Sequence, residues 1–129
     1  MKIVLLADNR KNERLVNWCI AYKQILARHE LLSVSQVQKT IETQAGLQVN
    51  GIATDVTAGT NQIAARAEYN EVDAVIYLHD PKSDSYADKT LIMRACDTNN
   101  IPYASNLASA ELLILAIDRG DLDWRDLVH

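Results

Sequence analysis

Cysteine and histidine, the residues that build most metal centres, are scarce and scattered in this sequence. The 129 residues include two cysteines, Cys19 and Cys96, which form no CxxC or other metal-ligand spacing. The three histidines, His29, His79 and His129, lie far apart. We therefore predict no metal site and no cofactor. Both cysteines are expected to be reduced thiols in the core of a cytoplasmic protein.

The sequence also lacks the features that mark several protein classes. Its longest apolar runs are a few residues, which excludes a membrane span, and its first residues do not follow the pattern of a secretory signal. It contains neither a GxGxxG pattern nor a Walker P-loop, the usual nucleotide-binding motifs. The 13 basic and 17 acidic side chains give a net charge of -4. This balance argues against nucleic acid and against an anionic membrane as partners.

The apolar content is sufficient for a folded domain. Hydrophobic residues make up 48% of the chain and charged residues 23%, which is typical of globular proteins and unlike disordered ones. A chain of this size buries roughly two-thirds of its unfolded surface. No repeat, low-complexity stretch or long linker divides the sequence. We therefore expect residues 1–129 to form a single domain.

Strand and helix patterns alternate five times along the chain. Apolar runs predict strands at 2–7, 31–34, 47–53, 72–78 and 101–105. Apolar residues at helical spacing predict helices at 15–26, 35–46, 60–68, 87–97 and 107–119, and an amphipathic tail at 124–128. Ser35 and Gln38 have the spacing of a capping box. This order predicts an α/β fold, a three-layer α/β/α sandwich with a five-stranded, mostly parallel sheet.

In such a sheet, ligands bind at the carboxyl ends of the strands. Asp8 directly follows the first strand, where it is either a helix cap or a site residue. His79 and Asp80 end the fourth strand, either as an oriented acid–base pair or as structural groups. Asp55 and Thr60 belong to a hydroxyl-rich loop, which either holds an anion at a helix start or only caps that helix.

Several segments together resemble one enzyme family. They lie at 1–7, 45–49, 73–81, 101–112 and 123–127. In these segments, and over essentially the whole chain, the sequence resembles the methylglyoxal synthases. The resemblance implies the same fold, named methylglyoxal-synthase-like. It also implies a homo-oligomer, typically a hexamer, for which Trp124, Leu127 and Val128 are candidate interface residues unless they pack on their own domain.

The resemblance also implies a reaction. The family eliminates phosphate from dihydroxyacetone phosphate: a carboxylate removes a proton next to the carbonyl, and the resulting enediolate expels phosphate to give methylglyoxal. Chemistry of this kind needs a positioned base, donors for the developing oxyanion and a cradle for the phosphate.

The phosphate contacts of the family are replaced in this sequence. Where the family's first loop has His-Asp and a following Lys, this chain has Asp8, Asn9 and Asn12. The family's Thr-Gly-Thr-Thr-Gly cradle corresponds to residues 34–38, with Gln36 at its centre. The valines at 34 and 37 neither permit the close backbone approach of glycine nor donate as a hydroxyl does.

The catalytic loops differ as well. The family's Ser-Gly-Pro-x-Gly-Gly-Asp loop corresponds to residues 54–60, which keeps a hydroxyl at Thr54 and puts Thr60 at the position of the catalytic base. The family's Pro-His-x-Pro-Asp loop has lost its His in a deletion, and Asp88 is its remaining aspartate. A hydroxyl without an activating partner is a weak base, and losing a general base costs about 10²–10⁴ in rate.

Two functions from different classes follow. The first is a catalytically degraded protein that binds a small ligand or a protein partner, or that serves as a regulatory module. Its candidate ligand-binding residues are Asp8, Asn9, Asn12, Gln36, Thr54, Asp55 and Asp80. The second is an active methylglyoxal synthase, a carbon–oxygen lyase, whose candidate catalytic residues are Asp88 as the base, His79 and Thr60.

The aspartates in the loops allow a further expectation. If Asp8, Asp55, Asp80 and Asp88 converge, their like charges favour a cation over a phosphate as the guest. If they do not converge, they are separate, solvated helix caps.

Overall fold

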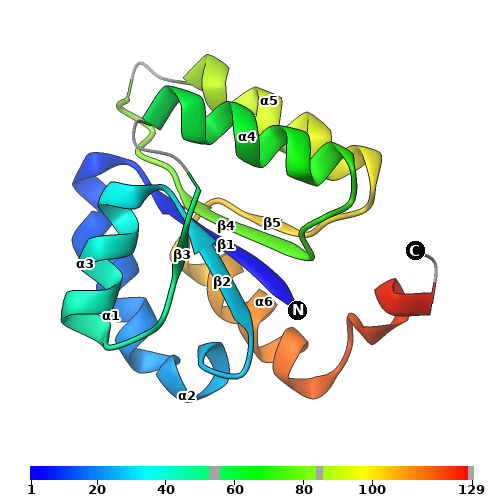
Figure 1. Ribbon diagram of the computed structural model, residues 1–129, viewed down its shortest axis with the longest axis horizontal. Helices are drawn as coiled ribbons and strands as arrows, with labels where there is room; N and C mark the ends of the chain where they lie inside the picture. Colours follow the sequence, from blue (N-terminus) through cyan, green and yellow to red (C-terminus); the bar gives the residue numbers. More distant parts are fainter. Residues whose placement is uncertain (53–55, 84–85, 128–129) are drawn as a thin grey trace.

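Parallel strands form the central layer of the protein (Figure 1). The computed structural model describes residues 1–52, 56–83 and 86–127. In this part of the chain the strands are β1 (Lys2–Ala7), β2 (Glu30–Ser33), β3 (Asn50–Gly51), β4 (Ala74–Leu78) and β5 (Tyr103–Ala104). Their order across the sheet is β3-β2-β1-β4-β5, and each neighbouring pair is parallel.

The two central strands, β1 and β4, are continuous apolar runs because both of their faces are covered. Along β1, Ile3 and Leu5 point to one face of the sheet, whereas Val4 and Leu6 point to the other. All four side chains are buried, and each contributes about 1.5–3 kcal/mol relative to an exposed side chain. Val4 lies opposite Val75 of β4 in the ladder.

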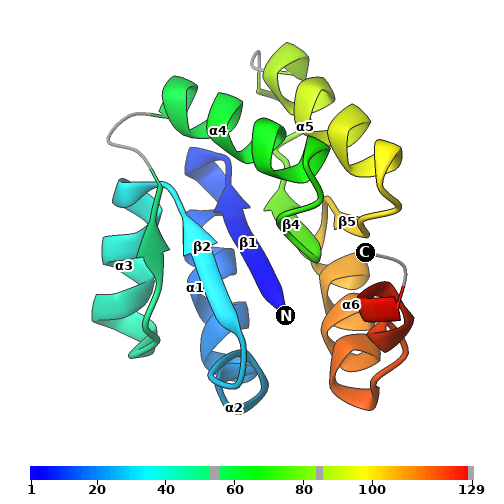
Figure 2. The same cartoon turned by 45° about the vertical axis from the view of Figure 1, so that its right-hand side comes forward.

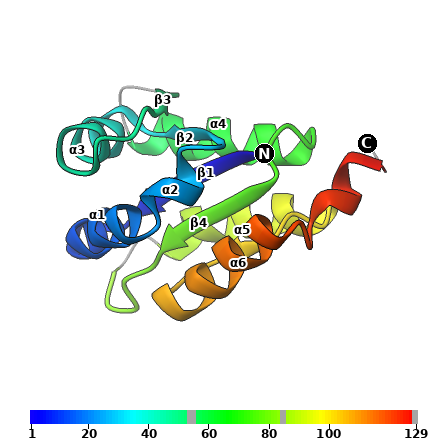
Figure 3. The same cartoon turned by 90° about the horizontal axis from the view of Figure 1, so that it is seen from below.

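Helices cover both faces of the sheet and give the molecule three layers. The helices α4 (Val56–Glu68) and α5 (Tyr86–Thr98) lie on one face. The other face carries α1 (Asn12–Ala21), α3 (Ser35–Ala45) and α6 (Leu107–Arg119), as Figures 1 and 2 show. Seen from below, α1 and α6 lie in front of the sheet and α4 and α5 behind it (Figure 3). The predicted three-layer α/β/α fold is confirmed.

The edge strand β3 is shorter than the predicted strand 47–53. Val49 is buried, as the alternating pattern requires, but the ladder to β2 begins only after it. Side chains of α3 bond to its backbone instead: Gln38 donates to the Val49 carbonyl at 2.9 Å, and the Val49 N–H donates to Glu42 at 3.2 Å. The predicted capping box is wrong for the same reason, because Gln38 reaches towards β3 and the helix cap is Val34, which makes no side-chain capping bond.

The predicted helix 15–26 is divided at Tyr22, where φ is -109° and ψ is 23°. It forms α1 and the short α2 (Lys23–Leu26). Backbone hydrogen bonds continue through the break, from Tyr22 N to Trp18 O and from Leu26 N to Tyr22 O, each at 3.0 Å. The apolar stripe therefore passes across the break without a change of face. Helix α6 has the predicted bounds and ends at Gly120, whose φ of 81° suits glycine.

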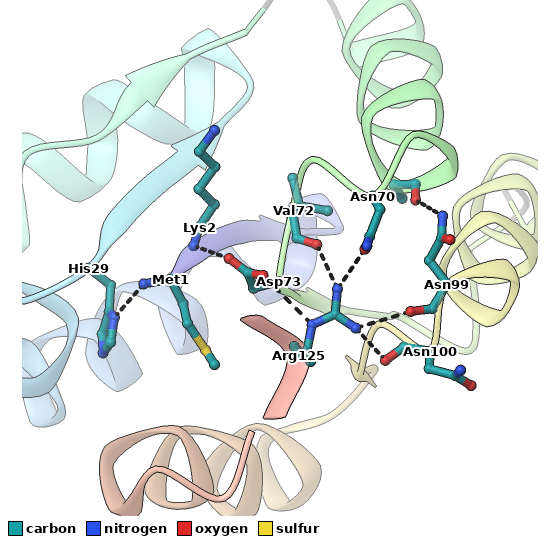
Figure 4. A network of polar contacts seen from close by, with 10 residues as sticks. Met1, Lys2, His29, Asn70, Val72, Asp73, Asn99, Asn100 and Arg125 are labelled. Carbon is teal, nitrogen blue, oxygen red and sulfur yellow. Dashed lines mark hydrogen bonds and ion pairs between the residues drawn. The ribbon is translucent and has the colours of Figure 1, made fainter. Parts of the chain in front are cut away.

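Arg125 connects the C-terminal segment to the amino end of the sheet through hydrogen bonds. It belongs to the 3-10 helix η2 (Asp123–Leu127), and its side chain is 1% exposed. The guanidinium donates to the carbonyls of Asn99 at 3.0 Å and Asn100 at 2.7 Å, and to the side-chain oxygen of Asn70 at 2.7 Å (Figure 4). Asn70 and Asn100 follow α4 and α5 with φ of 58° and 53°. One arginine therefore caps the ends of both helices, where a cation is favourable.

The start of the chain belongs to the same network. The Lys2 N–H donates to Asp73 at 2.8 Å, and Asp73 lies 3.6 Å from Nε of Arg125. The N-terminal ammonium lies 3.1 Å from Nδ1 of His29 (Figure 4). Burial, followed by the ammonium and Arg28, lowers the pKa of His29. The imidazole is therefore neutral at pH 7 and accepts a hydrogen bond from the ammonium.

The outer residues of the tail are exposed. Trp124 is 44% exposed and Leu127 is 85% exposed, so Leu127 does not pack on its own domain. Val128 lies outside the described residues. The role of these side chains as interface residues stays a prediction.

Both cysteines are buried and free, as predicted for core thiols. Burial raises the pKa of Cys19 and of Cys96 to about 12, which makes both thiols poor nucleophiles. In the part of the chain that the structure describes, no helix has the length and apolar character needed to cross a bilayer.

Candidate functional site

A cavity opens at the carboxyl end of the sheet, between β1 and β4. These neighbours are where the strand order changes direction: the chain leaves β1 for η1 (Asn9–Lys11) and α1 on one face, and leaves β4 for α5 on the other. A crevice at such a point is the usual ligand site of parallel sheets. The cavity has a volume of about 540 Å³, which is the size of a small-molecule site.

Asp8 lines this cavity at the end of β1. One oxygen of its carboxylate accepts the N–H of Asp80 and a proton of the Lys89 ammonium. The other oxygen accepts from the Tyr77 hydroxyl at 3.4 Å. Asp8 makes no side-chain capping bond to η1, the helix that it precedes. Of the two interpretations of Asp8, the structure therefore favours a cavity residue over a helix cap.

Lys89, in the first turns of α5, forms a buried ion pair with Asp8. The lysine side chain is 1% exposed and the aspartate side chain is 9% exposed. The ammonium also lies 5.8 Å from the centroid of the Tyr77 ring, a favourable position for a cation. A buried ammonium needs partners of this kind because it has lost its water. The charge of Asp8 is thus balanced within the protein.

Asp80, at the end of β4, also faces a cation. Its carboxylate is 10% exposed and lies 3.7 Å from Nε of Arg10. The backbone N–H of Lys82 donates to the same side chain at 3.0 Å. The side chains of Arg10 and Lys82 are exposed and line the cavity. The second carboxylate of the site is therefore balanced as well.

Only two of the four aspartates considered for a cation site, Asp8 and Asp80, have described side chains. Asp8 and Asp80 are adjacent, but each is paired with a basic side chain. Among the residues that the structure describes, no group of three or more metal-ligating side chains is found. Asp55 lies outside the described residues, as does the side chain of Asp88.

His79 directly follows β4 at the carboxyl end of the sheet, and its described contacts are with two tyrosines. Its Nε2 lies 2.6 Å from the hydroxyl of Tyr103 on β5, and its ring makes edge contacts with Tyr77 and Tyr103. Burial and then Lys89 lower the pKa of His79, and Asp8 opposes this shift. The imidazole is therefore neutral at pH 7. The geometry favours a structural role for His79 over an acid–base pair with Asp80.

Neutral polar side chains complete the cavity. Thr60, near the start of α4, is 5% exposed, and Gln36 comes from the first turn of α3. Asn9 and Asn12 come from η1 and the start of α1. The side-chain oxygen of Asn12 is buried and has no hydrogen-bond partner among the described atoms. These groups can donate to and accept from hydroxyls of a ligand.

Most of the predicted site residues come together here. The cavity is lined by Asp8, Asn9, Asn12, Gln36, Thr60 and Asp80. His79 is not among the described residues that line it. Thr54 and Asp55 lie outside the described residues, and the side chain of Asp88 does too. The catalytic and binding roles of all these residues stay predictions.

The sequence interpretation missed the three basic residues. Arg10 and Lys82 stand in the loops that it singled out, directly after Asp8-Asn9 and Asp80-Pro81. Lys89 had a clear signal: it precedes the buried Ile92 and Cys96 by three and seven positions. A lysine on the apolar face of a helix needs a buried counter-charge.

Comparison with known proteins assigns the fold and the family. A family model described as the MGS-like domain matches residues 14–105. The chain belongs to the MGS-like domain family. A crystal structure of methylglyoxal synthase from Elizabethkingia anophelis superposes on this MGS-like chain with a TM-score of 0.78 at 27% identity, covering 88% of this chain and 76% of that one.

Curated relatives match this MGS-like chain over its whole length. A protein named methylglyoxal synthase from Caldicellulosiruptor saccharolyticus is 41% identical, covering 100% of this chain and 93% of the relative. One of the same name from Brevibacillus brevis is 36% identical, covering 100% and 96%. The resemblance that the sequence segments indicated is therefore confirmed at the level of the family.

Proposed function

We propose that this chain is an MGS-like protein that binds a small polar molecule in the cavity without eliminating phosphate from dihydroxyacetone phosphate. The observation that carries this proposal is the threonine at position 60. The family resemblance assigns the catalytic base to this position, and here a buried hydroxyl lines the cavity instead of a carboxylate. A threonine hydroxyl is a far weaker base than the carboxylate that it replaces.

The two described carboxylates of the cavity do not replace the missing base. Asp8 is paired with the buried Lys89, and Asp80 is paired with Arg10. If Asp8 took a proton from a substrate, the Lys89 ammonium would be left buried without a counter-charge, and breaking such a pair is costly. The pairing supports a site that binds rather than one that removes protons.

The wall that replaces the phosphate cradle also supports this proposal. Val34 and Val37 line the cavity at the start of α3, and Val34 is 4% exposed. Their side chains donate no hydrogen bonds and hold the ligand away from the backbone. A phosphate needs several donors at close range.

The alternative is an active methylglyoxal synthase. Relatives 36% to 41% identical over the whole chain carry that name. In this case Asp88 would be the base, as predicted from the sequence. His79 is poorly placed to help Asp88 in proton transfer, because its Nε2 contacts the hydroxyl of Tyr103.

One assay separates the two functions. Purified protein at high concentration is incubated with dihydroxyacetone phosphate, and both methylglyoxal and inorganic phosphate are quantified, with the Brevibacillus brevis relative as the positive control. We expect no release of either product above the spontaneous rate. Release that disappears in Asp88→Asn would establish the lyase and overturn the proposal.

We also propose that the protein works in the cytoplasm and forms a homo-oligomer. Two free, buried thiols support the first statement. The exposed Trp124 and Leu127 support the second.

A further inference from the structure

The charges around the cavity point to the class of its ligand. Three basic side chains, Arg10, Lys82 and Lys89, stand in or directly behind the described lining. Two carboxylates, Asp8 and Asp80, stand beside them. Each carboxylate faces one cation, so one positive charge is in excess among these described groups. The acidic crevice considered from the sequence also included Asp55 and Asp88, whose side chains lie outside the described residues.

The excess charge suits one type of anion. A phosphate monoester carries about -1.5 to -2 charges at neutral pH and offers three strongly accepting oxygens. A carboxylate carries one charge and two accepting oxygens, which matches one uncompensated cation and a wall that lacks a phosphate cradle.

Lys89 makes this balance positive, because the remaining two cations and two carboxylates would cancel without it. Because its side chain is 1% exposed, its charge is poorly screened by water, whereas the side chains of Arg10 and Lys82 are exposed. Without Lys89, the carboxylate of Asp8 would present its full negative charge to the cavity.

We propose that the cavity binds a small hydroxylated monocarboxylate, and that Lys89 sets this preference by cancelling the charge of Asp8. This inference rests on the proposed binding function and names its ligand class. The carboxylate lies near Arg10 and Lys82. The hydroxyls of the ligand bond to the neutral wall, where Asn12 and Gln36 offer amide groups. A volume of about 540 Å³ accommodates an acid of two to four carbons with its bound water.

A matched set of probes tests the ligand class. Glycerate, glycerol and glycerol 3-phosphate share one carbon skeleton and differ in charge, and glycolate and lactate extend the set of acids. Each is titrated into the full-length protein by calorimetry at low salt and pH 7. We expect at least one of the acids to bind at least about tenfold more tightly than glycerol and glycerol 3-phosphate, because one favourable charge pair is worth that much near a protein surface. Equal or tighter binding of glycerol 3-phosphate, or binding of none of the acids, would overturn the inference.

A double-mutant cycle that neutralises Lys89 and Asp8 tests the role of Lys89. We expect Lys89→Met to weaken binding of the best acid by about tenfold or more, and the double variant Asp8→Asn with Lys89→Met to return it to within about threefold of wild type. A merely structural lysine predicts no recovery in the double variant. Lys82→Gln is the exposed control, which folds regardless of the buried pair and is expected to weaken binding by about threefold; unchanged binding in this variant would contradict the charge balance.

Failure of the proposed function and failure of the proposed ligand class give different results. Release of methylglyoxal from dihydroxyacetone phosphate overturns the proposed function. Binding of an uncharged or phosphorylated probe without turnover leaves the proposed function intact and overturns only the ligand class.

Discussion

At the scale of single residues, Lys89 is, like Arg125, a basic side chain that is only 1% exposed. It occupies the same face of α5 as Ile92 and Cys96, yet it carries a full charge. The buried ammonium is stabilised by the carboxylate of Asp8 and by the face of the Tyr77 ring. The pair also ties the start of α5 to the end of β1, two elements that are far apart in the sequence.

The pair makes a prediction for stability. Lys89→Met leaves Asp8 buried without a counter-charge, so we expect the free energy of unfolding to fall by about 3 kcal/mol. Urea denaturation followed by circular dichroism measures this change. Lys82→Met is the matched control, because that side chain is exposed, and we expect its effect to stay within about 0.5 kcal/mol. Equal effects of the two substitutions would contradict the buried pairing.

The histidines give a prediction for pH. Folding lowers the pKa of both His29 and His79 below 6.5, mainly through burial. The unfolded chain therefore binds more protons than the folded protein between these lowered values and 6.5, and stability is lost as the pH falls through that range.

Urea denaturation at pH values above and below 6.5 tests this prediction. We expect the wild-type protein to lose stability on the acid side, and the double variant His29→Gln with His79→Gln to lose less. A variant that keeps the full pH dependence would show that other groups cause it.

At the scale of elements, Arg125 joins η2 to the ends of α4 and α5. Its guanidinium donates to the carbonyls of Asn99 and Asn100, directly after α5, and to the side-chain oxygen of Asn70, after α4. Both helices begin near the cavity, where they carry Thr60 and Lys89. The contact therefore holds the layer that supplies these two side chains.

We expect Arg125→Met to lower the free energy of unfolding by about 3 kcal/mol, because it leaves two carbonyl groups without the guanidinium and Asp73 without its cation. Arg119→Met is the control in the same segment, since Arg119 pairs with Asp121 at the surface with side chains 65% and 50% exposed, and such pairs contribute about 0–1 kcal/mol. The comparison uses urea denaturation. A loss below 1 kcal/mol for Arg125→Met would mean that the buried network adds little.

The elements also show where sequence patterns fail. The apolar run of β1 and the helix ended by Gly120 were predictable because burial and a left-handed glycine act locally. The late start of the β3 ladder was not, because Gln38 and Glu42 bond to Val49 across a tertiary contact. A side chain that serves a distant backbone group leaves no local signal.

At the scale of the whole molecule, the sequence pattern placed candidate residues at the edge of the sheet where the structure has its cavity. Asp8 and Asp80 were identified because Asp8 directly follows β1 and Asp80 lies in the loop that begins after β4. Their charge state was missed, because the partners Arg10 and Lys89 become neighbours only when the loops and α5 are folded around β1 and β4. The family resemblance located the residues, but their pairing depends on tertiary structure.

The exposed tail gives a prediction for assembly. We expect the protein to elute as a homo-oligomer, with Leu127→Asp shifting the population towards monomers, since Leu127 is 85% exposed. Size-exclusion chromatography with light scattering measures the mass directly. Tyr69→Asp is the control on another exposed apolar side chain. A monomeric wild-type protein would contradict the proposed assembly.

Deuterium exchange shows whether this MGS-like cavity binds a small molecule without removing a carbon-bound proton. Dihydroxyacetone phosphate is incubated with the protein in deuterated water. Proton NMR follows the signals of the two methylene groups that flank its carbonyl. We expect the methylene protons to exchange at the same rate as in a sample without protein, and we expect no methylglyoxal signal. Exchange that rises with protein concentration would show a working base in the cavity and would contradict the account, even if no phosphate were released.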